Sequence, residues 1–250
     1  MNYAIVTGAS KGLGASAAQR FISEGIPVIS VSRNENSALK QAAESAGVSY
    51  THYSCDLSSA QQVQSVFAQI CDDVFQHAEN VYVINNAGVI EPIDVTGELD
   101  PVLVQRNIQV NLSSPILISN LFLQKAKETG SRVIIANVTS GAGERPIQGW
   151  SIYCSTKAAV NLFTMTAGLE LQNSGSSSKV IAFSPGIMDT DMQVTIRSSS
   201  EDTFADVNTF RNYKESGSLR SPDTVASALV KLVLADHLDN GKIYNVNNLL

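Results

Sequence analysis

The sequence predicts an α/β fold in which a doubly wound parallel sheet of about seven strands is covered by helices on both faces. Short β-branched runs alternate with helical stretches along the 250 residues. Several runs, such as Val-Ile-Ile-Ala at 133–136, are apolar on both faces, which is typical of a parallel sheet buried between helix layers. Strand–helix alternation with right-handed crossovers indicates a Rossmann-type sheet, which binds ligands at the carboxyl ends of its strands.

The strands and helices follow one another in a regular order. Strands are predicted at 4–7, 28–32, 50–54, 81–85, 133–138, 180–184 and 242–246. Helices are predicted between them at 14–24, 35–46, 60–77, 101–128, 151–173 and 222–234. Asp100-Pro101 and Ser221-Pro222 each place a capping residue before a proline at the first helical position. No internal repeat or linker divides the chain, so a single domain over 1–250 is expected.

Residues 189–220 interrupt the alternation of strands and helices. The segment has mixed polarity, includes Ser198-Ser199-Ser200, and comes shortly after Pro185-Gly186. A stretch of this length without clear sheet structure at the carboxyl edge suggests a lid over a substrate. A surface excursion without a role is the alternative.

Composition and charge exclude several classes of partner. The net charge is −6 and no run of Lys or Arg forms a basic stripe, so nucleic acid is not expected as a partner. A strand is predicted almost at the first residue, which leaves no room for a signal peptide, and no apolar stretch reaches the ~18 residues of a membrane span. Scattered, unpaired cysteines favour a reducing cytoplasm. The three histidines lie far apart in the sequence, so no metal site is expected: His52, His77 and His237.

A glycine-rich turn follows the first predicted strand and opens the first helix. Glycines at Gly8, Gly12 and Gly14 let a backbone approach a pyrophosphate, and the helix N-terminus offers unpaired N–H groups and a positive dipole end. The spacing Gly-x-x-x-Gly-x-Gly differs from the commoner dinucleotide fingerprint. Its place in the first strand–helix unit still predicts a dinucleotide site, to which Ser10, Lys11 and Leu13 belong.

The end of the second strand indicates which dinucleotide binds. NAD sites usually carry an acid there for the ribose 2′-hydroxyl, whereas a cation accommodates the 2′-phosphate of NADP. Here the acid is missing and Arg33-Asn34 follows, while Lys11 offers a second positive charge. The sequence therefore favours NADP(H). Asp56-Leu57, after the third strand, is placed to contact the adenine edge, although Asp56 can equally cap the next helix.

A tyrosine and a lysine four residues apart predict the chemistry. On a helix, Tyr153 and Lys157 share one face, and Ser140 lies 13 residues before the tyrosine. A carbonyl that accepts a hydride needs a proton donor near its oxygen. A phenol is a weak acid unless a cation lies beside it, so the pair predicts a general acid with a lowered pKa.

These motifs together resemble the short-chain dehydrogenase/reductase family over nearly the whole chain. The matching stretches are Thr7–Gly14, Asn85-Asn86-Ala87-Gly88, Asn111, Ser140, Tyr153-x-x-x-Lys157 and Pro185-Gly186. The resemblance implies that Tyr153 donates the proton, that Lys157 lowers its pKa and holds the nicotinamide ribose, and that Ser140 binds the substrate oxygen.

The same resemblance implies further roles. Asn111 is expected to kink its helix and to hold a water that supplies Lys157 with protons, with a simple polar contact inside the helix as the alternative. Two helices, 101–128 and 151–173, are expected to pair in a homodimer. Further cofactor contacts are expected from Asn86, Ala87, Gly88, Pro185, Gly186, Ile187 and Thr190.

Within this family the chain resembles sepiapterin reductases and bacterial benzil reductases. The similarity lies in 137–142, 149–153, 184–193, 195–197 and 217–223, and it implies a vicinal dicarbonyl substrate reduced at one carbonyl. An apolar slot for flat aromatic groups is expected from Trp150, Met188 and Met192, with Ile187 and Phe210 beside them; Trp150 is alternatively a packing anchor.

One departure favours diketones over pterins. Sepiapterin reductases anchor the pterin with a carboxylate near the chain end, where this sequence has Asn245, and an amide cannot make that charge-assisted bond. Three functions therefore stay open: NADPH-dependent reduction of an aromatic 1,2-diketone of the benzil-to-benzoin type, reduction of a pteridine carbonyl, and non-catalytic sensing of NADP(H). The presence of Ser140, Tyr153 and Lys157 weighs against a sensor, which needs no proton donor.

Overall fold

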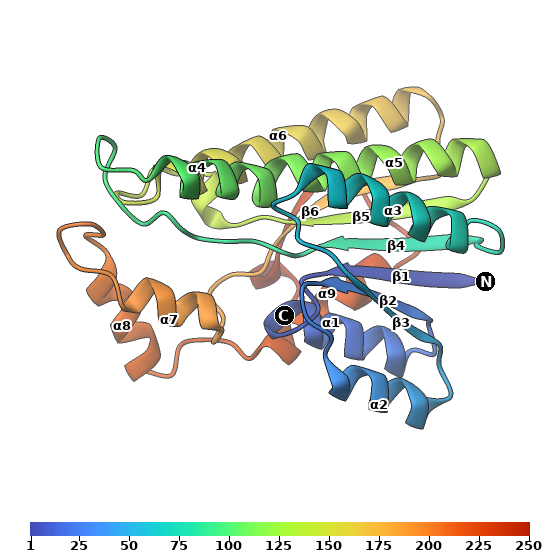
Figure 1. Cartoon of the computed structure of the whole chain (residues 1–250), viewed down its shortest axis with the longest axis horizontal. Helices are drawn as coiled ribbons and strands as arrows, with labels where there is room; N and C mark the ends of the chain where they lie inside the picture. The colour runs from blue at the N-terminus through green and yellow to red at the C-terminus, as the bar shows by residue number, and fades with distance from the viewer.

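The computed structural model describes residues 1–250 and contains one sheet of seven parallel strands (Figure 1). The spatial order is β3-β2-β1-β4-β5-β6-β7. The predicted fold class is confirmed, and each predicted strand agrees with an observed one to within two residues. The strands are β1 (Asn2–Thr7), β2 (Val28–Ser32), β3 (Tyr50–Ser54), β4 (Asn80–Asn85), β5 (Arg132–Val138), β6 (Lys179–Ser184) and β7 (Ile243–Asn245).

Helices cover both faces of the sheet, as Figure 1 shows. One face carries α1 (Gly12–Ser23), α2 (Ser37–Ala46) and α9 (Pro222–Val233); the other carries α3 (Ala60–Val74), α5 (Ser114–Thr129) and α6 (Ser151–Asn173). Successive residues of a strand enter opposite cores: Ala4 and Val6 belong to one apolar cluster and Ile5 to the other. The apolar runs in the sequence exist because both faces of the sheet are buried.

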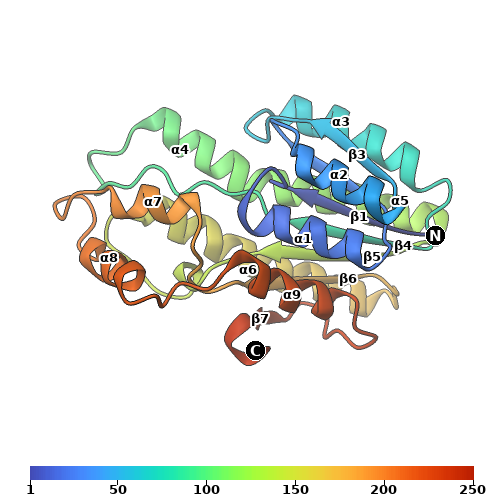
Figure 2. The same cartoon turned by 90° about the horizontal axis from the view of Figure 1, so that it is seen from below.

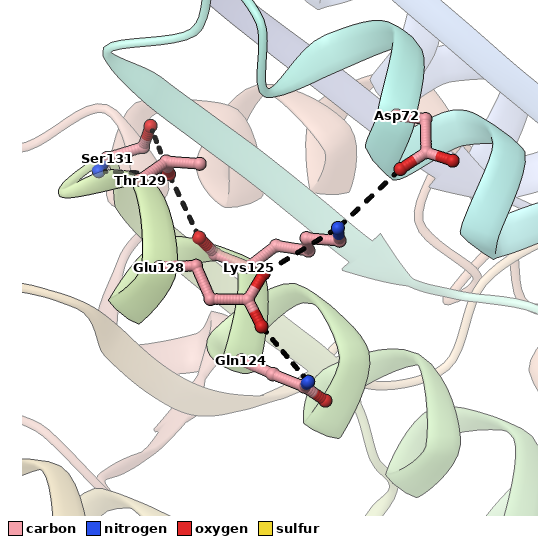
Figure 3. A network of polar contacts seen from close by, with 6 residues as sticks. All are labelled: Asp72, Gln124, Lys125, Glu128, Thr129 and Ser131. Atoms are coloured by element: carbon pink, nitrogen blue, oxygen red, sulfur yellow. Dashed lines mark hydrogen bonds and ion pairs between the residues drawn. The ribbon is translucent and has the colours of Figure 1, made fainter.

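The α3–α5 contact shows what holds one helix layer together. At the surface, Lys125 Nζ of α5 lies 3.6 Å from Asp72 Oδ1 of α3 and 3.6 Å from Glu128 Oε2 (Figure 3). Ion pairs with exposed carboxylates contribute about 0–1 kcal/mol. Beneath them Phe67 and Phe122 are fully buried with ring centroids 6.3 Å apart, so apolar packing contributes more to this contact.

The helix predicted at 101–128 is interrupted in the middle. It consists of α4 (Pro101–Ile108), a π-helical turn η1 (Gln109–Ser113) and α5. Asp100 starts α4 as predicted, because its Oδ1 accepts hydrogen bonds from Val102 N and Leu103 N. The π turn contains Asn111, where the family resemblance implied a kink. One-turn π segments inside α-helices occur frequently at functional sites.

Two helices occupy the 189–220 segment, which the sequence marked only as a stretch without clear sheet structure. They are α7 (Asp191–Arg197) and α8 (Val207–Glu215), and they lie apart from the sheet at the end opposite the N-terminus (Figures 1 and 2). Both are short and α8 buries only Val207, so neither has the long apolar periodicity by which a helix is recognised.

None of the helices combines the length and apolar character that crossing a membrane requires.

Candidate active site

A cavity of about 870 Å³ lies at the carboxyl ends of the strands, where ligands bind in doubly wound sheets. It joins the two regions that the sequence marked, the glycine turn and the Tyr153–Lys157 pair. The predicted site residues on its wall are Gly8, Ser10, Lys11, Gly12, Leu13, Arg33, Asn34, Asp56, Leu57, Asn86, Ala87, Gly88, Ser140, Tyr153, Lys157, Pro185, Gly186, Met188, Thr190 and Met192.

The glycine turn forms a cradle that fits an anionic pyrophosphate. Gly8 and Gly12 have φ angles of 68° and 57°, which favour glycine, and α1 begins at Gly12 without a side-chain cap. Its first N–H groups are therefore available to an anion. Gly14 lies behind the wall, where a Cβ would stand 2.4 Å from the Gly8 carbonyl oxygen, so only glycine allows this close packing.

Two arginines line the part of the cavity at the end of β2. Arg33 comes from the end of that strand and Arg106 from α4, and neither forms an ion pair within the chain. Hydrogen bonds from Ser58 N and Oγ lower the pKa of Asp56, and both arginines lower it further. The Asp56 carboxylate lies in the cavity wall and closes a turn with Ser58. It does not cap the next helix, because Ser59 is the N-cap of α3 and accepts from Gln62 N, so the capping alternative is wrong.

Lys11 has a partner that the sequence did not suggest. Its Nζ lies 2.5 Å from Asp191 Oδ2 at the start of α7, and both side chains are about 70% exposed. The ammonium group therefore connects the glycine turn to the 189–220 segment. Of the two predicted 2′-phosphate ligands, only Arg33 is without an anionic partner in the chain.

The proposed catalytic pair lies on the first turns of α6. Tyr153 and Lys157 are 6% and 5% exposed, and Lys157 Nζ lies 5.6 Å from the centroid of the tyrosine ring. Lys157 Nζ also donates a 2.8 Å hydrogen bond to the Val138 carbonyl at the end of β5. Ser140 follows two residues later and lines the same cavity. Strand β5 and helix α6 thus bring the three side chains together.

Burial shifts the pKa values of this pair in opposite directions. It raises the pKa of Tyr153 to about 12, although the hydrogen bond with Ser140 opposes the rise, and it lowers the pKa of Lys157 to about 8. The sequence predicted that Lys157, together with a bound nicotinamide, lowers the pKa of the tyrosine; within the chain itself burial is the dominant effect and raises that pKa instead. A neutral phenol is, however, the form that donates a proton.

Asn111 fixes the backbone beside the catalytic pair without reaching the cavity wall. Its Nδ2 donates to Val89 O at 2.8 Å, and its Oδ1 accepts from Val89 N at 2.9 Å. A Cβ on Gly88 would lie 3.3 Å from Asn111 Oδ1 and 3.8 Å from Lys157 Nζ. Asn111 and Lys157 therefore flank Gly88. Because Asn111 bonds the loop after β4, the alternative of a simple polar contact inside its own helix does not describe it.

The expected substrate residues divide into two groups. Met188 and Met192 line the cavity. Trp150 lies outside its wall: it is 4% exposed and stacks on Phe204 with ring centroids 4.7 Å apart and planes at 7°. Trp150 therefore acts as a packing anchor, the alternative that the sequence left open. Its stacking joins the start of α6 to the 189–220 segment.

Two other residues that the sequence singled out also lie outside the cavity wall: Ile187, an expected cofactor contact, and Asn245, the counterpart of the pterin-anchoring carboxylate. The carbonyl of Ile187 accepts a hydrogen bond from Arg220 N. Asn245 Oδ1 accepts from Asn247 N and so caps η3 (Val246–Asn248), the 3-10 turn that follows β7.

Several wall residues were not found from the sequence. Besides Arg106, they include Ile90, Glu91, Val110 and Gln193. Gln193 on α7 is 6% exposed, and its Oε1 is buried without a hydrogen-bond partner. It lies in one of the stretches that carried the family resemblance, but nothing in its spacing marks it as a site residue.

The cavity at the edge of this doubly wound sheet holds both a phosphate cradle and a buried tyrosine–lysine pair. This combination defines an oxidoreductase that uses a nicotinamide dinucleotide. The comparisons agree with this class. The model of the short chain dehydrogenase family matches residues 2–201. The chain belongs to the short-chain dehydrogenase family, whose members use a nicotinamide cofactor.

Relatives of this chain include enzymes with assigned substrates. Benzil reductase ((S)-benzoin forming) of Bacillus subtilis is 37% identical over 251 residues, which cover 100% of both chains. Sepiapterin reductase of Bos taurus is 29% identical, covering 95% of this chain and 91% of its own length. The crystal structure of a short-chain dehydrogenase/reductase from Saccharomyces cerevisiae superposes with a TM-score of 0.83 at 29% identity, covering 99% of this chain and 96% of that one.

Proposed function

We propose that the protein is an NADPH-dependent carbonyl reductase that reduces one carbonyl of an aromatic 1,2-diketone, as in the conversion of benzil to benzoin. The observation that supports this most is the single cavity in which the dinucleotide cradle, the Ser140–Tyr153–Lys157 group and the apolar side chains of Met188 and Met192 meet. The whole-length similarity to a benzil reductase favours the same substrate class.

The side chains have distinct roles in the proposed reaction. The bound nicotinamide supplies the hydride. Tyr153, held protonated by burial, donates its hydroxyl proton to the carbonyl oxygen. The Ser140 hydroxyl hydrogen-bonds the same oxygen and fixes its position. Lys157, 5.6 Å from the phenol ring, stabilises the phenolate that remains after the proton has left.

The preference for NADPH rests on Arg33. Its guanidinium lines the cavity without an anionic partner in the chain, as a ligand for a 2′-phosphate must. Lys11 has a smaller role in this proposal, because Asp191 already neutralises it. Asn34 and the adenine-side pair Asp56-Leu57 complete this part of the cofactor site.

A reversed charge at Arg33 tests the cofactor proposal. Arg33→Glu should lower the ratio of kcat/KM for NADPH to that for NADH by about 100-fold, since one charge-assisted contact is replaced by repulsion. Arg20→Glu makes the same charge change on the exposed side of α1 and should leave the ratio unchanged. Equal ratios for wild type and Arg33→Glu would refute the assignment.

Reduction of a pteridine carbonyl is the second candidate. It is favoured by the similarity to a sepiapterin reductase over 95% of this chain. Against it, Asn245 supplies no carboxylate and its side chain caps a turn instead.

A substrate panel separates these functions. Oxidation of NADPH is followed with benzil, with sepiapterin and with a simple ketone such as acetophenone. We expect kcat/KM for benzil to exceed the other two by at least about tenfold. Preference for sepiapterin would replace the proposal by the pteridine function. Tight binding of NADPH without turnover of any of the three would indicate a sensor.

We also propose that the chain is one domain over 1–250 in which the 189–220 segment covers the substrate. Residues Met188 to Gln193 and Thr195 line the cavity. The segment is joined to the rest of the chain by the Lys11–Asp191 ion pair and by the Trp150–Phe204 stack.

A homodimer through α4–α5 and α6 belongs to the same proposal. Helix α6 leaves Leu162, Met165 and Leu169 at least 51% exposed, and their spacing of three and four residues places them on one face. A stripe of this kind is typical of a surface that a second subunit covers.

A further inference from the structure

A fully buried asparagine lies beneath the proposed catalytic group. Asn107 of α4 is 0% exposed and is absent from the cavity wall, so it touches neither cofactor nor substrate. A buried amide is costly unless all of its donors and acceptors are paired. An aliphatic residue would fill the same position without that requirement.

All the hydrogen-bonding capacity of the Asn107 amide is used. Its Nδ2 donates to Val89 O at 3.2 Å and to Glu91 O at 2.7 Å. Its Oδ1 accepts from Asn111 Nδ2 at 2.8 Å and from Thr156 Oγ1 at 3.2 Å. Two donated and two accepted bonds satisfy an amide completely. Such a network is worth more than isolated bonds and fixes the groups that it joins.

The partners of Asn107 all adjoin the proposed active site. Val89 and Glu91 line the cavity directly after Gly88. Asn111 belongs to the π turn η1. Thr156 precedes Lys157, and its hydroxyl proton is shared between Asn107 Oδ1 and the Tyr153 carbonyl at 3.1 Å. One side chain thus connects the loop after β4, the π turn and the helix that carries the general acid.

We propose that Asn107 is a positioning residue for carbonyl reduction. It acts through Asn111 and Thr156, holding the cavity loop and α6 in the relative position that the reacting groups need. The inference rests on the catalytic roles proposed for Tyr153 and Lys157. Because Asn107 lies away from the cofactor cradle, its loss should lower kcat while leaving NADPH affinity nearly unchanged.

The test is a double-mutant cycle between Asn107→Leu and Asn111→Ala, with benzil and NADPH. Asn107→Leu keeps the approximate shape and should lower kcat by about 10- to 100-fold, the scale of a small misplacement of reacting groups, with the Kd for NADPH within about threefold of wild type. If the two residues act as one unit, the kcat of the double variant should be no more than about threefold lower than the kcat of the worse single variant. Asn173→Leu, at the exposed end of α6, is the control and should retain wild-type kcat.

A second variant keeps the inference testable if Asn107→Leu fails to fold. Thr156→Val removes one hydrogen-bond partner of Asn107 with little change in shape and should lower kcat by about three- to tenfold. In the double variant with Asn111→Ala, the two losses of kcat should again not multiply. Wild-type kcat in these variants, or losses that multiply, would overturn the positioning role. An inactive wild-type protein would instead refute the proposed function, so the two failures are distinguishable.

Discussion

For Tyr153 and Lys157, burial affects the pKa values more than the charge of the neighbouring side chain does. In water a nearby ammonium group lowers the pKa of a phenol, but here both groups are about 95% buried and desolvation acts on each separately. The raised pKa of the tyrosine keeps it as a neutral acid, and the lowered pKa of the lysine lies close to physiological pH. At the residue scale, therefore, pH should control the reaction through the lysine rather than the tyrosine.

The pH dependence follows from the lowered pKa of Lys157. Below about pH 8 the side chain is charged and stabilises the developing phenolate; above about pH 8 it becomes neutral and that stabilisation is lost. In the reductive direction, kcat/KM for NADPH, which reports the free enzyme, should fall about tenfold per unit above that pH. Ionisation of Tyr153, with a pKa of about 12, contributes nothing between pH 6 and pH 10.

Initial rates between pH 6 and pH 10, with NADPH varied and benzil held well below its KM, measure this dependence. Lys157→Arg, which stays charged throughout, should flatten the profile if the variant retains turnover. A wild-type profile that is level up to pH 10 would show that the lysine charge plays no part.

At the scale of elements, regular strands and capped helices were predictable and the π turn was not. Apolar runs mark buried parallel strands, and the proline at the start of α4 and of α9 marks a helix start, because these signals are local. Within η1, Asn111 hydrogen-bonds Val89, a residue 22 positions away, and no local pattern encodes such a contact. The family resemblance supplied the position of the kink but not its form.

The helices α7 and α8 were missed for a related reason. Few of their side chains are buried, and the Phe204 that anchors the segment stacks on Trp150, 54 positions earlier in the chain. The same limit applies to the cavity. Motif residues such as Gly8 and Tyr153 were found from spacing, whereas Arg106 and Gln193 reach the wall only because α4 and α7 fold against it.

At the scale of the whole molecule, the exposed stripe on α6 predicts the oligomeric state. The dimer proposal expects a solution mass of twice 26.7 kDa by size exclusion with light scattering. Leu169→Glu places a charge in the covered face and should reduce the mass to that of one chain. Val194→Glu is a matched control, because Val194 is 56% exposed but lies on α7. A monomeric wild-type protein would contradict the proposal.

The central claim is that one cavity couples a dinucleotide site to a phenolic proton donor. Replacing Tyr153 by phenylalanine tests it most directly, because only the hydroxyl is removed from a buried ring. With benzil and NADPH, Tyr153→Phe should lose at least about 100-fold in kcat and bind NADPH with a Kd within about twofold of wild type, while Tyr3→Phe on β1 should retain wild-type values for both. A Tyr153→Phe enzyme that turns over benzil at nearly the normal rate would contradict the account.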